Sequence, residues 1–246
     1  MNKTIEDRLD ALEAKVGTDE KTTRVLVIQD RSGSMADRVA ETISGYNEYV
    51  GTLKDDTSDE AFLTLVQFDD RYEVKEDNTP VARVEGLSES TYVPRGMTAL
   101  LDAVGRGVTD LKGKLRSNER ALVVIMTDGI ENYSKEYTKQ RVTELIRSCE
   151  DTGRWTFVFL GAGQDSWQGG QMLGLRRAQT VHYGEDAHTH GLTYSSLGAM
   201  TSQLRGGKNL AMANAGTVTS DVLREKGGNV ELEDEDDGEI PAGAGG

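Results

Sequence analysis

The chain has 246 residues, and its 42 acidic and 28 basic residues give it a formal net charge of −14. This excess of acid disfavours nucleic acids and anionic membranes as partners, because binding phosphate groups requires a basic surface. The single cysteine excludes an intramolecular disulfide framework and a four-thiolate zinc site. No stretch approaches the roughly 18 consecutive apolar residues that cross a bilayer, and the first residues lack the apolar run of a secretory signal. We therefore expect a cytoplasmic protein that binds neither nucleic acid nor membrane.

Residues 4–16 predict an amphipathic helix near the start of the chain. Their apolar side chains are spaced by 4, 3 and 4 positions, which places them on one face. The pattern is shorter than the roughly three or four heptads that indicate a coiled coil. Residues 1–22 are therefore expected to form a helix and linker, which either packs beside the main domain or mediates self-association. The apolar stripe consists of Ile5, Leu9, Leu12 and Val16.

Apolar runs of strand length alternate with helical stripes between residues 23 and 205. Uninterrupted apolar runs are typical of strands covered on both faces, as in parallel sheets. A polar strand that follows a turn at residues 69–71 is expected at an edge. The pattern predicts an α/β fold: a doubly wound, mostly parallel sheet with one antiparallel edge strand and helices on both faces. The predicted strands are residues 24–29, 61–68, 72–75, 121–127, 155–160 and 180–183, and the helical stripes lie within residues 39–53, 101–115 and 142–149.

The carboxyl-terminal part of the chain lacks this alternation. Residues 206–226 either continue as a helix or lead into a tail, and the sequence leaves both open. Residues 227–246 contain seven acidic residues and no basic one, so half of the net charge lies there. Such a composition buries too little apolar surface to offset the entropy of ordering. We expect these last residues to form a disordered acidic tail.

Hard oxygen donors follow two of the predicted strands and precede a predicted helix. Asp30, Ser32 and Ser34 alternate directly after the first strand. Thr98 precedes the second long helix, and Asp128 directly follows the strand at residues 121–127. In a doubly wound sheet these segments meet beyond the carboxyl ends of the strands, where the strand order reverses. Magnesium prefers oxygen ligands and keeps several waters, so the five residues predict a magnesium site.

The same residues resemble the metal-ion-dependent adhesion site of the von Willebrand factor A (vWA) domain. That site is a D-x-S-x-S motif followed by a threonine and then an aspartate, and all five elements occur here in order. The resemblance covers residues 23–205, and the segments DRSGSM, RGMTALLDAV and MTDGIEN look like those of intracellular bacterial members. It implies a Rossmann-like vWA fold with bound Mg²⁺, for which Mn²⁺ and Ca²⁺ are alternatives. By the family pattern, Ser32, Ser34 and Thr98 contact the metal directly or through water. Asp30 and Asp128 hold its waters.

The resemblance also implies a non-enzymatic protein-binding module. In the family, the incompletely neutralised cation accepts an oxygen from an Asp or Glu of a partner protein, which suits an adaptor or assembly role. Side chains around the metal would then form a partner-binding rim. We expect this rim to contain Arg31, Met35, Met97, Glu131, Asp165 and Trp167.

Two other functions stay open. The chain could be an oligomeric structural or assembly protein of a bacterium or bacteriophage, located in the host cytoplasm if bacteriophage-encoded. Residues 4–16 or the acidic tail would then mediate self-association, and the tail could also fill the open position on the metal. A metal-dependent hydrolase is disfavoured, because only Asp30 and Asp128 could act as general base and both belong to the surroundings of the metal.

Overall fold

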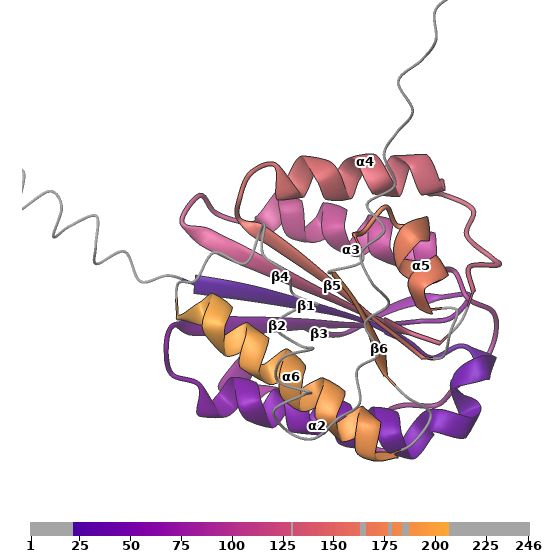
Figure 1. Ribbon diagram of the computed structural model, residues 1–246, viewed down its shortest axis with the longest axis horizontal. Helices are drawn as coiled ribbons and strands as arrows, with labels where there is room; N and C mark the ends of the chain where they lie inside the picture. Colours follow the sequence, from indigo (N-terminus) through magenta and orange to yellow (C-terminus); the bar gives the residue numbers. More distant parts are fainter. Residues whose placement is uncertain (1–21, 129, 163–165, 177–178, 184–186, 207–246) are drawn as a thin grey trace, which may run out of the picture.

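The computed structural model describes residues 22–128, 130–162, 166–176, 179–183 and 187–206 (Figure 1). The predictions for residues 4–16 and for the acidic tail lie outside this part of the chain, as does the prediction for residues 206–226 except at Gly206, which follows the last helix. Within the described ranges, no helix is both long and apolar enough to span a membrane.

A six-stranded sheet forms the centre of the molecule, with the strand order β3-β2-β1-β4-β5-β6. The pair β2 and β3 is antiparallel, and the other neighbouring pairs are parallel. The strand order reverses between β1 and β4, so the topological switch point lies at their carboxyl ends. This confirms the predicted doubly wound sheet with one antiparallel edge strand. The strands are β1 (Thr22–Asp30), β2 (Glu60–Phe68), β3 (Tyr72–Pro80), β4 (Glu119–Thr127), β5 (Trp155–Ala162) and β6 (Thr180–Tyr183).

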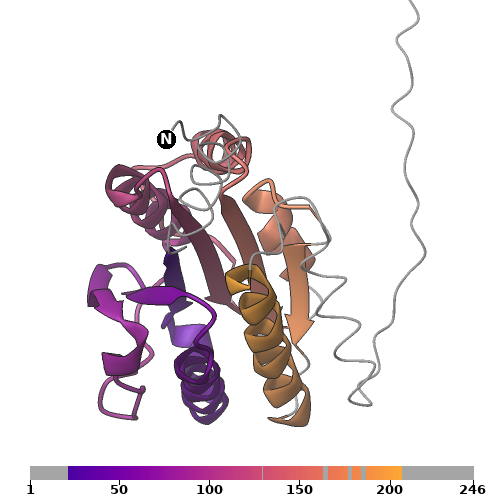
Figure 2. The same ribbon diagram turned by 90° about the vertical axis from the view of Figure 1, so that its left-hand side faces the viewer.

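Helices cover both faces of the sheet, as Figures 1 and 2 show from two directions. Helices α2 and α6 pack side by side on one face, and α3, α4 and α5 cover the other. The α-helices are α2 (Val39–Asp55), α3 (Leu100–Lys114), α4 (Lys139–Glu150), α5 (Ser166–Met172) and α6 (Ala187–Arg205), and the short 3₁₀ helices are η1 (Gly33–Arg38) and η2 (Val81–Arg83).

The middle of strand β1, residues 25–28, is continuously apolar because both of its faces are covered. Val25 and Val27 belong to the core beneath α2 and α6, whereas Leu26 and Ile28 belong to the core beneath α3 and α4. All four side chains are buried. A strand covered on both faces needs apolar side chains on both faces. The end of β1 is therefore fixed by two cores, and the loop that follows it starts from a rigid position.

Two elements differ from the sequence prediction. The sequence pattern does not predict α6, because Ala187–Arg205 is rich in glycine, serine and threonine. Its buried residues between Tyr194 and Leu204 recur at helical spacing, which is the signal that would have indicated it. Strand β3 continues to Pro80 instead of ending at Lys75. Its side chains are exposed or half-buried at the sheet edge, so no apolar pattern marks its length.

Candidate metal centre

Four of the five predicted metal-site residues form a continuous set of contacts at the switch point. Asp30 ends β1, and Asp128 directly follows the neighbouring strand β4. The Ser32 N–H donates to Asp30 Oδ1 at 2.6 Å. Ser32 Oγ lies 3.0 Å from Ser34 Oγ, and the Ser34 hydroxyl donates to Asp128 Oδ1 at 2.7 Å. The loop after β1 therefore brings its two hydroxyl groups to the end of β4.

Asp30 is fully buried, and both of its carboxylate oxygens accept hydrogen bonds. The Thr127 hydroxyl donates to Oδ2, and the Tyr92 hydroxyl donates to the main-chain oxygen of Asp30 at 2.6 Å. Burial raises the pKa of Asp30 to about 6, although the hydrogen bonds from Thr127 and Ser32 oppose this, and the charge of Asp128 raises it further. A cation nearby would favour the ionised form of this carboxyl group.

Thr98 is joined to the same region through its main chain. It is buried, its N–H donates to Asn132 Oδ1 at 2.9 Å, and its carbonyl accepts from the Asn132 N–H at 3.0 Å. Two residues earlier, the Gly96 carbonyl accepts from the Gly33 N–H at 3.2 Å. Gly96 has a φ of +70°, and a Cβ atom there would lie 2.3 Å from Asp70 Oδ1, so this turn requires glycine. The segment before α3 is thus bonded to the loops after β1 and β4.

The donor set fits a magnesium ion. In an octahedral site with metal–oxygen distances of about 2.0–2.1 Å, neighbouring ligand oxygens lie about 3 Å apart. Ser32 Oγ and Ser34 Oγ, which are hydrogen-bonded to each other at 3.0 Å, already lie at a separation compatible with this spacing. Within the described residues, no group of three or more His, Cys, Asp or Glu side chains could hold a metal ion. The candidate is therefore a site rich in hydroxyl groups.

Arg38 is a competing partner for one of the site carboxylates. Its Nε lies 3.3 Å from Asp128 Oδ2. A cation at the site would attract the same carboxylate. The guanidinium group therefore reduces the negative charge that Asp128 offers to a metal.

Arg31 and Met35 do not belong to the partner-binding rim, which corrects their prediction. Arg31 is only 4% exposed, and its guanidinium group pairs with Asp69 and Glu73. Met35 is 1% exposed and lies in the core beneath α2. The loop is polar in sequence, but both side chains point inward. Arg31 forms ion pairs with its counter-ions, and Met35 packs among apolar side chains.

The other predicted rim residues have mixed positions. Met97 is exposed. Glu131 accepts a hydrogen bond from the Leu101 N–H at 2.8 Å, so it satisfies a donor at the start of α3. Asp165 and the side chain of Trp167 lie outside the described part of the chain.

Several polar residues that hold these loops were not singled out by the sequence pattern. Only Asp69 carried a signal, because it directly follows the apolar strand at residues 61–68, as Asp30 and Asp128 follow theirs. The residues missed are Arg38, Asp69, Glu73, Tyr92, Arg95, Thr127 and Asn132.

No protein-family model and no curated protein matches the sequence. Solved structures do match the fold. The PilB minor pilin from Streptococcus sanguinis matches with a TM-score of 0.53 at 12% identity, over 76% of this chain and 62% of that chain. The vWF domain of the type V pili tip protein Mfa5 from Porphyromonas gingivalis matches with a TM-score of 0.55 at 11% identity, over 74% and 95%. The ArnB paralog VWA2 from Sulfolobus acidocaldarius matches with a TM-score of 0.50 at 15% identity, over 71% and 44%.

These likenesses concern the fold. The chain spans less than two thirds of the length of the pilin and of VWA2, and identities of 11–15% carry no information about ligands. The strand order, the layers of helices and the matched structures together show that this chain has a von Willebrand factor A-like fold.

Proposed function

We propose that the chain is a non-enzymatic protein-binding module that coordinates a carboxylate of a partner protein through a bound Mg²⁺ ion. Asp30, Ser32, Ser34, Thr98 and Asp128 would hold this ion. The observation that carries the proposal is the continuous contact from Asp30 through two serine hydroxyls to Asp128, with the hydroxyl oxygens 3.0 Å apart. By the family pattern, the direct ligands are neutral hydroxyl groups and the two carboxylates hold waters of the ion. A divalent ion held in this way would be incompletely neutralised by its ligands and would favour an anionic ligand.

Exposed apolar side chains lie close to the candidate site. Met97 precedes Thr98, and Ile130 and Tyr133 lie on either side of Asn132, which is bonded to the Thr98 main chain. Single exposed apolar residues are common, but neighbouring ones are typical of interaction sites. They favour a partner segment in which apolar side chains flank the acidic residue.

Binding is better supported than catalysis. A metal-assisted hydrolase needs a general base that can take a proton from water. Both oxygens of Asp30 already accept hydrogen bonds. Asp128 accepts from Ser34 and pairs with Arg38. These hydrogen bonds and the ion pair with Arg38 disfavour a role for either carboxylate as a general base.

Assembly is the second candidate function. Two of the matched structures are described as a minor pilin and as a pili tip protein. In an assembly, several copies of the chain would present the same metal face, and weak single contacts would add up through avidity. The cytoplasmic location stays a prediction.

Calorimetric titration of the full chain with Mg²⁺ tests the metal site. Ser34→Ala removes one hydroxyl at an exposed position, and we expect it to weaken Mg²⁺ binding at least about tenfold. Asp128→Asn should act in the same direction. Asp151→Asn serves as the matched control for Asp128→Asn, because it makes the same charge change. Asp151 lies directly after α4 and before the start of β5, away from the candidate site. The proposal fails if wild type does not bind Mg²⁺ or if Ser34→Ala binds it equally well.

Retention of a partner tests the binding function. The immobilised chain should retain a protein from a cell extract in Mg²⁺ and release it in EDTA, and Ser34→Ala should retain none. Asp30→Ala is a poorer test, because it would leave the Ser32 N–H and the Thr127 hydroxyl without their buried acceptor. Metal-dependent turnover of p-nitrophenyl phosphate, lost in Ser34→Ala, would favour the hydrolase instead.

A further inference from the structure

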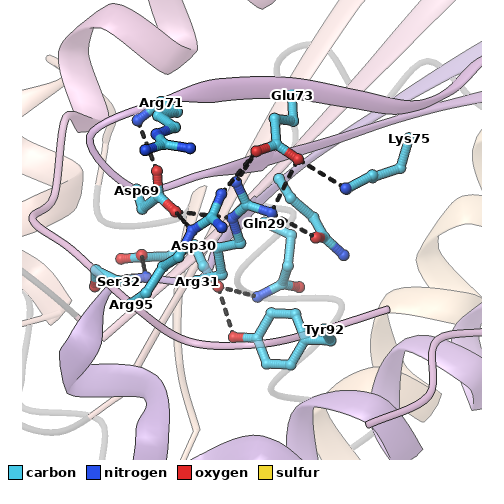
Figure 3. Close-up of polar contacts among 11 residues, drawn as sticks. Gln29, Asp30, Arg31, Ser32, Asp69, Arg71, Glu73, Lys75, Tyr92 and Arg95 are labelled. Atoms are coloured by element: carbon cyan, nitrogen blue, oxygen red, sulfur yellow. Dashed lines mark hydrogen bonds and ion pairs between the residues drawn. The ribbon is translucent and has the colours of Figure 1, made fainter. Parts of the chain in front are cut away.

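Asp69 is a buried residue directly after β2 that forms hydrogen bonds to several segments of the chain. Its carboxylate accepts hydrogen bonds from Arg31 Nε at 3.0 Å, from Arg95 Nε at 2.8 Å and from the Arg71 N–H at 2.6 Å (Figure 3). Figure 3 shows both arginines reaching Asp69 and Glu73. The side chain of Asp69 is 0% exposed. One carboxylate without access to water therefore joins three parts of the chain.

Asp69 holds the loop after β1 through Arg31, which lies inside the D-x-S-x-S motif. The Arg31 N–H donates to Phe68 O at 2.8 Å, and its carbonyl accepts from the Arg95 N–H at 2.8 Å. Both the main chain and the side chain of Arg31 are thus fixed at the end of β2. The residues on either side of Arg31 are two of the predicted metal-site residues.

Asp69 also holds the segment before α3. Its main-chain oxygen accepts from the Ala99 N–H at 3.0 Å, while its carboxylate accepts from Arg95. Thr98 lies between these two points of attachment. Two of the three segments that carry the candidate metal site are therefore anchored on one aspartate.

Glu73 shares the two arginines from the water side. It accepts from Arg31 Nη2 at 2.6 Å and from Arg95 Nη2 at 2.8 Å. Its side chain is 33% exposed and borders a cavity of about 400 Å³. Hydrogen bonds from Arg31 and Lys75 hold the pKa of Glu73 well below its usual range. If the carboxylate of Glu73 were removed, water could accept the hydrogen bonds that the arginines donate to it. Water has no access to the carboxylate of Asp69, so its loss would leave the arginine donors unpaired.

We infer that Asp69 is a positioning residue for the metal site, which keeps the D-x-S-x-S loop and the Thr98 segment in register through Arg31 and Arg95. The inference rests on the proposed function, because it assumes that these segments bind Mg²⁺. Asp69 itself is not one of the proposed ligands, because its carboxylate accepts hydrogen bonds from Arg31, Arg71 and Arg95. Groups behind the ligands of a metal orient them, and their loss typically lowers metal affinity about 10- to 100-fold.

Asp69→Asn is the direct test. Asparagine keeps the size of the side chain, but one acceptor oxygen becomes a donor that faces other donors. The matched control is Asp59→Asn. The side chain of Asp59 is also buried and pairs with the buried Arg205, just before β2, near the amino-terminal ends of the strands. Both variants should unfold at lower temperature. Only Asp69→Asn should weaken Mg²⁺ binding, by about tenfold or more in calorimetry below both transitions.

Amide hydrogen exchange of the metal-free chain gives a second readout. The Gly33 and Ala99 N–H groups bond the two segments to their supports. In Asp69→Asn they should exchange at least about tenfold faster, and in Asp59→Asn at the wild-type rate, because local opening controls such amides. Unchanged exchange in Asp69→Asn overturns the positioning role.

The outcomes for the two proposals are distinguishable. If wild type binds no Mg²⁺, the proposed function fails, and the metal-site role of Asp69 fails with it. The exchange rates then report only whether Asp69 holds the two segments together. If wild type binds Mg²⁺ and Asp69→Asn binds it equally well, the positioning role fails and the proposed function stands. If Asp69→Asn does not fold, Arg95→Gln replaces it. The Arg95 side chain is 45% exposed, so this variant keeps the buried pair of Arg31 and Asp69 and should show both effects at smaller size.

Discussion

A side chain of aspartate pairs with a buried arginine at each end of the strands, once near the amino-terminal ends and once near the carboxyl-terminal ends. At the amino-terminal edge, Arg205 ends α6, pairs with Asp59 at 2.6 Å and donates to Leu53 O at 2.8 Å. At the carboxyl-terminal edge, Asp69 pairs with Arg31 at 3.0 Å. The first pair joins the ends of α6 and α2 to the start of β2, whereas the second joins loops that carry the candidate metal site. The same chemistry is therefore expected to stabilise the whole fold at one edge and to set local geometry at the other.

Arg205→Met is expected to have the largest effect on stability. It leaves the buried carboxylate of Asp59 without its counter-ion, and breaking a buried pair in this way costs about 3–5 kcal/mol of the free energy of unfolding. Methionine fills a similar volume, so the loss reports the charge pair more than a cavity. Urea unfolding followed by circular dichroism measures the change.

Two controls test whether the effect of Arg205→Met is specific to the buried pair of Asp59 and Arg205. Arg83→Met removes the same charge from an exposed position in η2 and should change stability by less than about 0.5 kcal/mol. In Arg205→Met, Mg²⁺ affinity should equal that of wild type wherever the variant is folded. A loss of Mg²⁺ affinity in Arg205→Met would show that the two edges are coupled and would break the comparison.

Gly45→Ala should have an intermediate effect, at the contact that holds α6 against α2. A Cβ atom on Gly45 would lie 2.0 Å from the ring of Tyr194 on α6. Overpacking of this kind typically costs about 1–3 kcal/mol. Gly51→Ala on the same helix is the control, since its Cβ would meet nothing within 4 Å. It should stabilise the chain by up to about 1 kcal/mol through helix propensity, and equal melting temperatures for the two variants would contradict the tight α2–α6 contact.

The sequence predicted the fold best where strands are covered on both faces. Uninterrupted apolar runs occupy residues 25–28 of β1 and residues 121–126 of β4, so these buried positions are visible without the structure. Helix α6 carries a weaker signal. Its apolar side chains recur at helical spacing, but small residues that allow close approach to α2 lie between them. A Cβ atom on Gly198 would lie 2.7 Å from the side chain of Thr52. Small residues that permit such an approach look like a loop in sequence.

The candidate site was predictable only in its linear part. The motif around Asp30 is short in sequence, so its donors can be read from the chain alone. The supports of Arg31 cannot, because Asp69 and Glu73 follow it by 38 and 42 residues and reach it only when β2 and β3 lie beside β1. The sequence alone therefore places this arginine of a polar loop on the rim, although its counter-ions hold it inside.

Arg38→Gln should give the smallest change, and in the opposite direction for the metal. The pair between Arg38 Nε and Asp128 Oδ2 is partly exposed, and such pairs contribute about 0–1 kcal/mol. Its removal frees a carboxylate oxygen, so Mg²⁺ should bind up to about fivefold more tightly while Tm stays unchanged. Calorimetric titration and thermal melting of the same samples measure both quantities.

The control for Arg38→Gln separates the pair from the overall charge. Arg106→Gln breaks an exposed pair with Glu136 and removes the same charge, so it should leave Mg²⁺ affinity unchanged. If both variants bind Mg²⁺ more tightly by the same factor, net charge is the cause. If neither does, Arg38 and the cation do not compete for Asp128. Tighter binding in Arg38→Gln alone would show that an arginine at the carboxyl-terminal edge acts on the site without acting on stability, which is the reverse of Arg205.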